Sequence, residues 1–91
     1  MSERTFIFQR DGGGQEETIK ISITETVSVL LNKYLNGKST TQTIKDFAFM
    51  IGANALKSKK FINSQIKNVP CLRPNAIIKV REVDTKAGGT I

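Results

Sequence analysis

Residues 18–35 read TIKISITETVSVLLNKYL, and the spacing of their apolar residues changes partway along the stretch. Ile19, Ile21 and Ile23 alternate with polar residues, which is typical of a strand with one buried face. From Val27 onward the apolar residues lie three and four positions apart, as on one side of an amphipathic helix. This helical stripe consists of Val27, Leu30, Leu31, Tyr34 and Leu35. The stretch therefore predicts a strand followed by a helix, with both apolar faces in one core.

The flanking residues indicate where these two elements begin and end. Thr26 or Thr24 can cap the helix, because a threonine hydroxyl accepts a hydrogen bond from the first turn. Asn36-Gly37 can end the helix with a left-handed residue. On the other side, residues 5–9 form a β-branched and aromatic run that predicts a strand with Phe6 and Phe8 facing inward. The glycine-rich residues 11–14 would then connect the two strands as a hairpin.

The rest of the chain predicts two more strands separated by irregular backbone. Residues 47–51 form an apolar run that ends at Gly52, and residues 76–83 form the last strand, with Ile78 and Val80 inward. Between them lie scattered apolar anchors and two prolines, which interrupt regular structure. We expect the first strand to lie between the second and the last. The predicted fold is α+β: a mixed sheet of four to five strands with one main helix on one face.

Composition excludes several classes of function. The 91 residues contain no histidine and one cysteine, Cys71, so histidine-based triads, histidine metal ligands and an internal disulfide are all absent. We therefore expect no enzyme, no metal and no cofactor. The sequence shows no signal peptide and no apolar run near the roughly 20 residues that span a bilayer. The lone cysteine fits a reducing compartment. We expect an intracellular protein, in the cytoplasm or nucleus.

The net charge of +6 is unevenly distributed, because residues 47–81 contain no acidic residue. A basic face of this kind could bind nucleic acid or an acidic protein. The alternative is a set of ordinary solvated lysines, which we favour because no aromatic residues interleave with the charges. Nucleic acid is therefore an unlikely partner.

Gly88 and Gly89 lie close to the end of the chain, beyond the last predicted strand. Two glycines in a row make a slender backbone without Cβ atoms, which can enter a narrow enzyme channel. The alternative is a plain flexible end. We divide the chain into a domain at residues 1–83 and a flexible tail at residues 84–91.

The order of these segments resembles the ubiquitin-like, β-grasp family over nearly the whole chain. Residues 5–9 and 18–23 resemble the first two strands of that family, and Thr26-Val27 resembles the Thr-Ile that opens its helix. Residues 49–52, followed by Leu56, resemble its Ile-Phe-Ala-Gly…Leu stretch. Residues 62–66 resemble its short anchored turn, and residues 77–83 its last strand. The diglycine after that strand completes the pattern of a divergent member.

The resemblance implies a protein modifier that is joined through the carboxyl group of Gly89 to an amine on a target. In that family an activating enzyme adenylates the glycine and captures it as a thioester, and conjugating enzymes pass it on. Because Thr90 and Ile91 follow Gly89, the resemblance implies a precursor. A protease, or a self-processing downstream domain, would cut between Gly89 and Thr90. Gly88 would keep the end slender enough to reach an active site.

Two features depart from ubiquitin itself. The tail lacks the Leu-Arg-Leu-Arg that precedes its diglycine, and Thr85 stands where its activating enzyme reads an arginine. The docking patch on the sheet also differs. By resemblance it falls on Phe49 and Arg81, next to Lys79, which we take as the partner-binding residues. In the other register of this strand Phe49 points inward, and Phe47 or Met50 points outward.

Two other functions remain open. A ubiquitin-like domain can act without conjugation as a binding module that docks a partner on the face around Phe49, Lys79 and Arg81. A β-grasp sulfur carrier would instead convert the same glycine carboxylate to a thiocarboxylate. Thr90 and Ile91 count against the sulfur carrier, because that group normally ends at its glycines.

Overall fold

A computed structural model describes residues 2–10, 16–36 and 44–82 of the chain. The described elements, in chain order, are β1 (Glu3–Arg10), β2 (Glu17–Ser22), α1 (Val27–Asn36), η1 (Ile44–Asp46), β3 (Phe47–Ile51), β4 (Asn54–Ala55), η2 (Ile66–Asn68) and β5 (Ile77–Glu82). This order confirms the predicted α+β succession of two strands, one helix and further strands. It adds the short strand β4 and two short 3-10 helices, η1 and η2, to that prediction.

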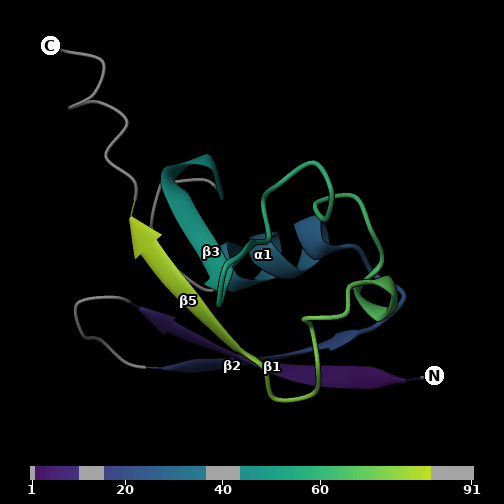
Figure 1. Cartoon of the computed structure of the whole chain (residues 1–91). Coiled ribbons are helices and arrows are strands. Elements are labelled where there is room, and N and C mark those ends of the chain that lie inside the picture. Colours follow the sequence, from purple (N-terminus) through teal and green to yellow (C-terminus); the bar gives the residue numbers. More distant parts are fainter. Residues whose placement is uncertain (1, 11–15, 37–43, 83–91) are drawn as a thin grey trace, which may run out of the picture.

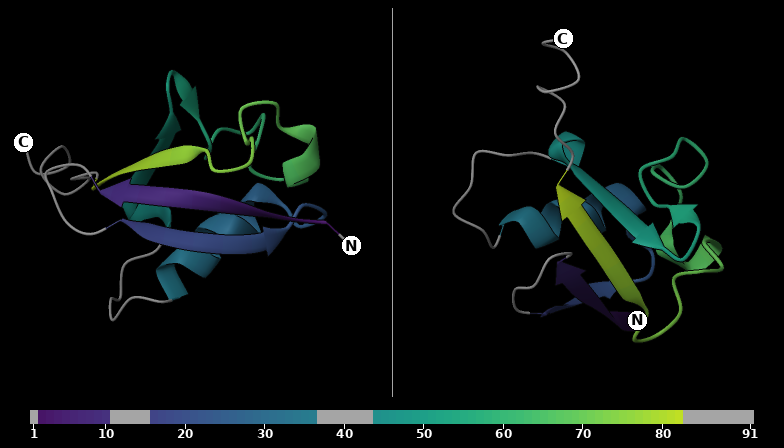
Figure 2. Two further views of the ribbon diagram at one scale, coloured as in Figure 1. Left: turned by 90° about the horizontal axis from the view of Figure 1, so that it is seen from below. Right: turned by 60° about the vertical axis from the view of Figure 1, so that its left-hand side comes forward.

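The strands form one five-stranded mixed sheet in the order β2-β1-β5-β3-β4. As expected, β1 lies between the second strand and the last. It pairs antiparallel with β2 and parallel with β5, where Phe8 lies opposite Ile78. Helix α1 covers one face of this sheet, so the core is a single layer between helix and sheet (Figure 1; Figure 2). The opposite face of the sheet, which we call the outer face, is not covered by a helix within the described part of the chain.

The helix forms where the spacing predicted it, and all five stripe residues from Val27 to Leu35 are buried. Thr26 lies just before it, and the Thr26 hydroxyl accepts a hydrogen bond of 3.4 Å from the backbone N–H of Val29. The hydroxyl therefore satisfies one of the amide groups that the first turn leaves without a helical partner. From the other face of α1, the Lys33 ammonium donates to the Lys20 carbonyl of β2 at 3.0 Å.

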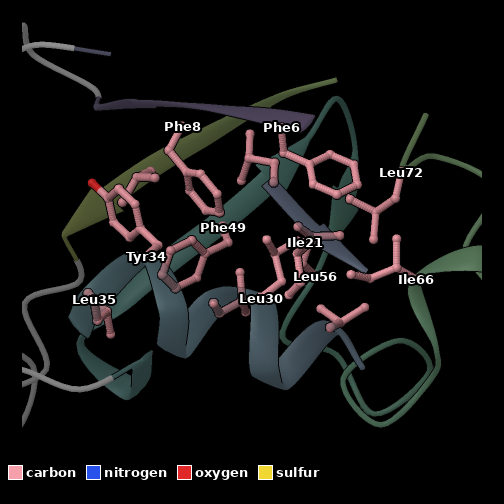
Figure 3. Packing of buried hydrophobic residues seen from close by; sticks show 14 of the residues in the cluster. Phe6, Phe8, Ile21, Leu30, Tyr34, Leu35, Phe49, Leu56, Ile66 and Leu72 are labelled. Carbon is pink, nitrogen blue, oxygen red and sulfur yellow. The ribbon is translucent and has the colours of Figure 1, made fainter. Parts of the chain in front are cut away.

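Aromatic rings fill one end of the core. The ring of Phe8 stacks on that of Tyr34, with centroids 4.3 Å apart, and meets the ring of Phe49 edge-on at 6.3 Å. Phe49 also meets Tyr34 edge-on, at 6.1 Å, so three strand and helix residues form one closed cluster (Figure 3). Stacked and edge-to-face geometries are those that the charge distribution of aromatic rings favours.

The prediction that Phe49 is exposed on the sheet is wrong. Its side chain is only 1% exposed, and that of Phe47 is equally buried. Successive side chains of a strand point to opposite faces. Phe47 and Phe49 therefore both point into the core, whereas Ala48 and Met50 point to the outer face. Met50 lies opposite Lys79 of β5 and is half-buried, so the alternative register holds for Met50 but not for Phe47.

The irregular chain between β4 and β5 is held by buried anchors and backbone hydrogen bonds. Leu56, Ile66 and Leu72 are fully buried. The Arg4 guanidinium of β1 donates to the Leu72 carbonyl at 2.6 Å, and the Asn75 amide donates to the Thr5 carbonyl at 2.7 Å. These bonds fix the segment leading into β5 against the edge of β1.

Candidate functional site

The residues predicted for conjugation and processing, Gly88, Gly89 and Thr90, lie outside the described residues. The structure does define the strand that leads to them. Strand β5 lies inside the sheet between β1 and β3, and its last residue, Glu82, pairs with Phe47. Gly88 follows six positions later in the sequence. The strand before the diglycine is thus held by hydrogen bonds on both sides.

The outer face of β5 carries two of the predicted partner-binding residues, Lys79 and Arg81, and both are exposed. Lys79 does not stand alone, because its ammonium donates to the Oε1 atom of Gln9 on β1. The Nε2 atom of Gln9 in turn donates to the Glu16 carboxylate at 2.5 Å. Gln9 thereby links a cation to an anion across the sheet, which fixes Lys79 over β1.

Arg81 differs from Lys79 because none of its neighbours in the described part of the chain pairs with its guanidinium. It lies opposite Ala48 of β3, whose short side chain leaves the guanidinium accessible. The outer face around β5 thus consists of two cations next to Met50 and Ala48. It can attract a carboxylate and bury a small apolar group, but it lacks a central aromatic residue.

A third cation, Arg10, packs against aromatic side chains of the core instead of extending into solvent. Its guanidinium lies 5.4 Å from the centroid of the Phe47 ring and hydrogen-bonds to the Tyr34 phenol. The burial of Tyr34 raises the pKa of its phenol, and the nearby charge and hydrogen bond of Arg10 act in the opposite direction. Arg10 therefore caps the aromatic end of the core, and sequence reasoning missed this role because arginine at a strand end normally extends into solvent.

Beside the sheet lies a groove of about 710 Å³, which we call the side groove. Its lining includes Ile51 of β3, Phe61, and residues of the segment that begins at Pro70 and Cys71 and ends at Ile77. Sequence reasoning placed Ile51 and Ile77 on strands and Phe61 among scattered apolar anchors, and did not connect them. Cys71, the one cysteine of the chain, is a half-buried free thiol in this lining.

Nothing among residues 2–10, 16–36 and 44–82 has the arrangement of a metal site: no group of three or more Cys, Asp or Glu side chains lies together. In the same residues no helix is long and apolar enough to cross a membrane. The features that the structure brings together are therefore an outer face, a groove and a strand that leads to a diglycine.

Comparison with known proteins identifies the fold. No protein-family model matches the sequence, and no curated protein matches it either. Thirty solved chains match in structure. Among them is the ubiquitin of Caldiarchaeum subterraneum, with a TM-score of 0.74 and 12% sequence identity. The match covers 93% of this chain and 99% of that one. The chain therefore has the ubiquitin-like β-grasp fold.

Proposed function

We propose that this chain is a precursor of a ubiquitin-like protein modifier that acts inside the cell. In this proposal, hydrolysis of the Gly89–Thr90 peptide bond removes Thr90 and Ile91 and leaves Gly89 with a free carboxylate. An activating enzyme and conjugating enzymes then join that carboxylate to the amine of a target protein. The observation that carries the proposal is a ubiquitin fold in which the last strand leads, six residues later, to a diglycine.

The modifier role requires no catalytic group of the chain itself. The modifier supplies one acyl carbon, and the enzymes supply the nucleophiles and the ATP. The described residues hold no metal cluster, and the whole chain has no histidine. A glycine at the acyl position lets the activating enzyme approach from both sides, because no Cβ blocks the carbonyl carbon.

The residues before the diglycine argue for dedicated enzymes. The segment between Glu82 and Gly88 reads VDTKA and holds one basic residue, Lys86, and one acidic residue, Asp84, with Thr85 between them. Ubiquitin presents two arginines in the same stretch. An activating enzyme that reads an arginine would meet Thr85 here, which supplies neither the charge nor the fork of donors that arginine uses. We therefore expect an activating enzyme with its own specificity.

The mature C-terminus tests the precursor proposal directly. We expect intact-mass spectrometry of the protein isolated from its own cells to show a chain that ends at Gly89. A Gly89→Val variant should remain uncut, because a branched side chain next to the scissile bond obstructs a narrow protease channel. A chain that still carries Thr90 and Ile91 in cells would contradict processing. A mass that shows sulfur in place of one carboxylate oxygen would indicate the sulfur carrier instead.

A non-conjugated binding module is the second candidate, and the outer face of β5 favours it. Arg81 is exposed and unpaired within the described residues, and it lies with Lys79 beside the half-buried Met50. Cations around a small apolar centre suit a partner surface with carboxylates at its rim. In this function the diglycine has no role.

We expect the double variant Lys79→Glu/Arg81→Glu to lose non-covalent partners if the outer face is the binding surface. Reversal of two rim charges should reduce their recovery about tenfold or more. The matched control is Lys59→Glu/Lys67→Glu, which changes the net charge equally at two exposed lysines elsewhere. Quantitative mass spectrometry of affinity-captured complexes compares the two variants with a chain ending at Ala87. Equal losses in both double variants would point to net charge rather than to this face.

A further inference from the structure

The side groove has the construction of a preformed binding site. Its wall at Cys71 is fixed from behind, because the neighbouring Leu72 is fully buried and its carbonyl accepts a hydrogen bond from Arg4 at 2.6 Å. The wall at Phe61 belongs to a tight turn in which the Phe61 and Ile62 amides both donate to the Ser58 carbonyl. A peptide that binds here would not need to order either wall, which lowers the entropic cost of binding.

The lining of the groove is mainly apolar. Ile51, Phe61 and Cys71 are half-buried, and Ile77 is 46% exposed. Ile77 and Val29 are the exposed large hydrophobic residues of the described chain, and Ile77 faces this groove. The volume of about 710 Å³ lies within the range of sites that enclose a compact ligand, about 300–1,000 Å³. The groove can therefore bury one or two bulky apolar side chains.

The charged residues that line the groove are both cations. Lys60 and Arg73 contribute to the lining, and no carboxylate does. Neither side chain forms an ion pair with any described residue. The Lys60 ammonium lies 5.4 Å from the centroid of the Phe61 ring, so a positive charge lies next to the apolar lining of the groove. A ligand that brings carboxylates would meet two cations that nothing in the described chain neutralises.

We propose that the side groove binds an acidic peptide segment of a partner protein, with a bulky apolar residue inserted between Phe61 and Ile77. Carboxylates that flank this residue pair with Lys60 and Arg73. The apolar lining disfavours nucleic acid, because single strands bind to a charged track with a series of aromatic platforms, and Phe61 is the one aromatic residue of this lining. The proposal does not depend on conjugation through Gly89. The groove adjoins the outer face at Ile77, which lies on the same side of β5 as Lys79 and Arg81, but neither of those two cations lines it.

Selection of displayed random short peptides on the immobilised full chain tests this assignment. We expect the enriched peptides to carry Asp or Glu around a leucine, isoleucine or phenylalanine. Fluorescence polarisation then measures their affinities for each variant. Lys60→Glu/Arg73→Glu should weaken peptide binding about tenfold or more, because each substitution removes one ion pair with a peptide carboxylate and replaces it with a repulsion between two carboxylates. The matched control Lys20→Glu/Lys67→Glu makes the same change in net charge at two exposed lysines that do not line the groove, and should retain binding within about threefold.

Amide chemical shifts locate the bound peptide. We expect peptide-induced shifts at Ile51, Cys71 and Ile77, and fewer at Ala48 and Arg81. Circular dichroism establishes that each variant is folded. The proposal is overturned if no acidic peptide is enriched, if a single-stranded oligonucleotide displaces the peptides from the same residues, or if the shifts map to the outer face. A Gly89→Val variant should bind the peptides unchanged, so a failure of conjugation and a failure of this site are distinguishable.

Discussion

A chain that ends at Gly89, incubated with ATP and a lysate of its own cells, is expected to form covalent adducts that a chain ending at Ala87 does not form. The two chains share every described residue and differ only in the diglycine. If the carboxylate of Gly89 is activated, one oxygen of that group bonds to the α-phosphorus of ATP and pyrophosphate leaves, which gives the acyl adenylate. An enzyme thiolate then displaces AMP to give a thioester, and a target amine displaces the thiolate.

The controls separate each step of this sequence. The thioester should disappear on treatment with a thiol reductant, whereas the amide adducts should persist. Omission of ATP should abolish both species, because a carboxylate at neutral pH does not acylate an amine. The full chain should form adducts only where a protease first removes Thr90 and Ile91. If the chain ending at Gly89 gives neither species while its domain is folded, the modifier proposal fails and the binding module becomes the better reading.

The same experiment tests whether the described surfaces take part in recognition. An activating enzyme must hold the domain while its channel receives the diglycine, and the outer face of β5 is the surface continuous with the strand that leads there. Variants at Arg81 could therefore reduce the rate of thioester formation without abolishing it. Loss of Gly89 removes the acyl carbon itself, so its effect should be complete and should not be rescued by more enzyme.

The parts of the fold that the sequence predicted are those in which apolar and polar residues alternate clearly. Ile21 sits between the polar residues Lys20 and Ser22, and the helical stripe from Val27 to Leu35 is interrupted by Ser28 and Asn32. In such segments only one face can be buried without burying polar groups. The buried faces of β2 and α1 were therefore determined by the residues themselves.

Strand β3 lacks such a signal. Its five residues, FAFMI, are all apolar, so the two registers differ only in which apolar side chains they expose. The structure buries Phe47 and Phe49 and turns the half-buried Ala48 and Met50 to the outer face, because the two rings extend the aromatic cluster around Phe8. The register of β3 was decided by contacts with aromatic residues on other elements, such as Phe8 of β1. No local pattern within β3 contains that information.

The side groove could not be predicted for a related reason. Its lining residues Ile51, Phe61, Cys71 and Ile77 are spread along the chain, the outermost two being 26 positions apart in the sequence, and the four come together only because β5 returns beside β3. Each alone reads as an ordinary core or surface residue. The sequence shows that residues 47–81 contain no acidic residue. It does not show that two cations of this stretch, Lys60 and Arg73, line one groove, because that depends on the tertiary fold.

The second large effect is expected from Phe8→Ala, which should lower the free energy of unfolding by about 3–5 kcal/mol. Phe8 is 1% exposed, stacks on Tyr34 and meets Phe49 edge-on, so its removal leaves a cavity and breaks two aromatic contacts. The remaining rings of the cluster lie on β3 and α1 and cannot all move inward to fill the space. Because domains of this size are stable by about 5–15 kcal/mol, the variant would be close to unfolding.

Urea titration measures this loss of unfolding free energy. The fluorescence of Tyr34, the one tyrosine in a chain without tryptophan, follows the transition, and its ring packs directly against Phe8. Phe61→Ala is the matched control, because it removes the same ring from a half-buried position at the side groove. Phe61→Ala should lower the free energy of unfolding by about 1 kcal/mol, the typical effect of a single substitution. The ratio of the two losses tests the core directly: if Phe61→Ala costs as much as Phe8→Ala, the aromatic cluster is not the main source of stability. The outcome also bears on recognition, since Phe61→Ala should remove peptide binding at the groove while the domain stays folded.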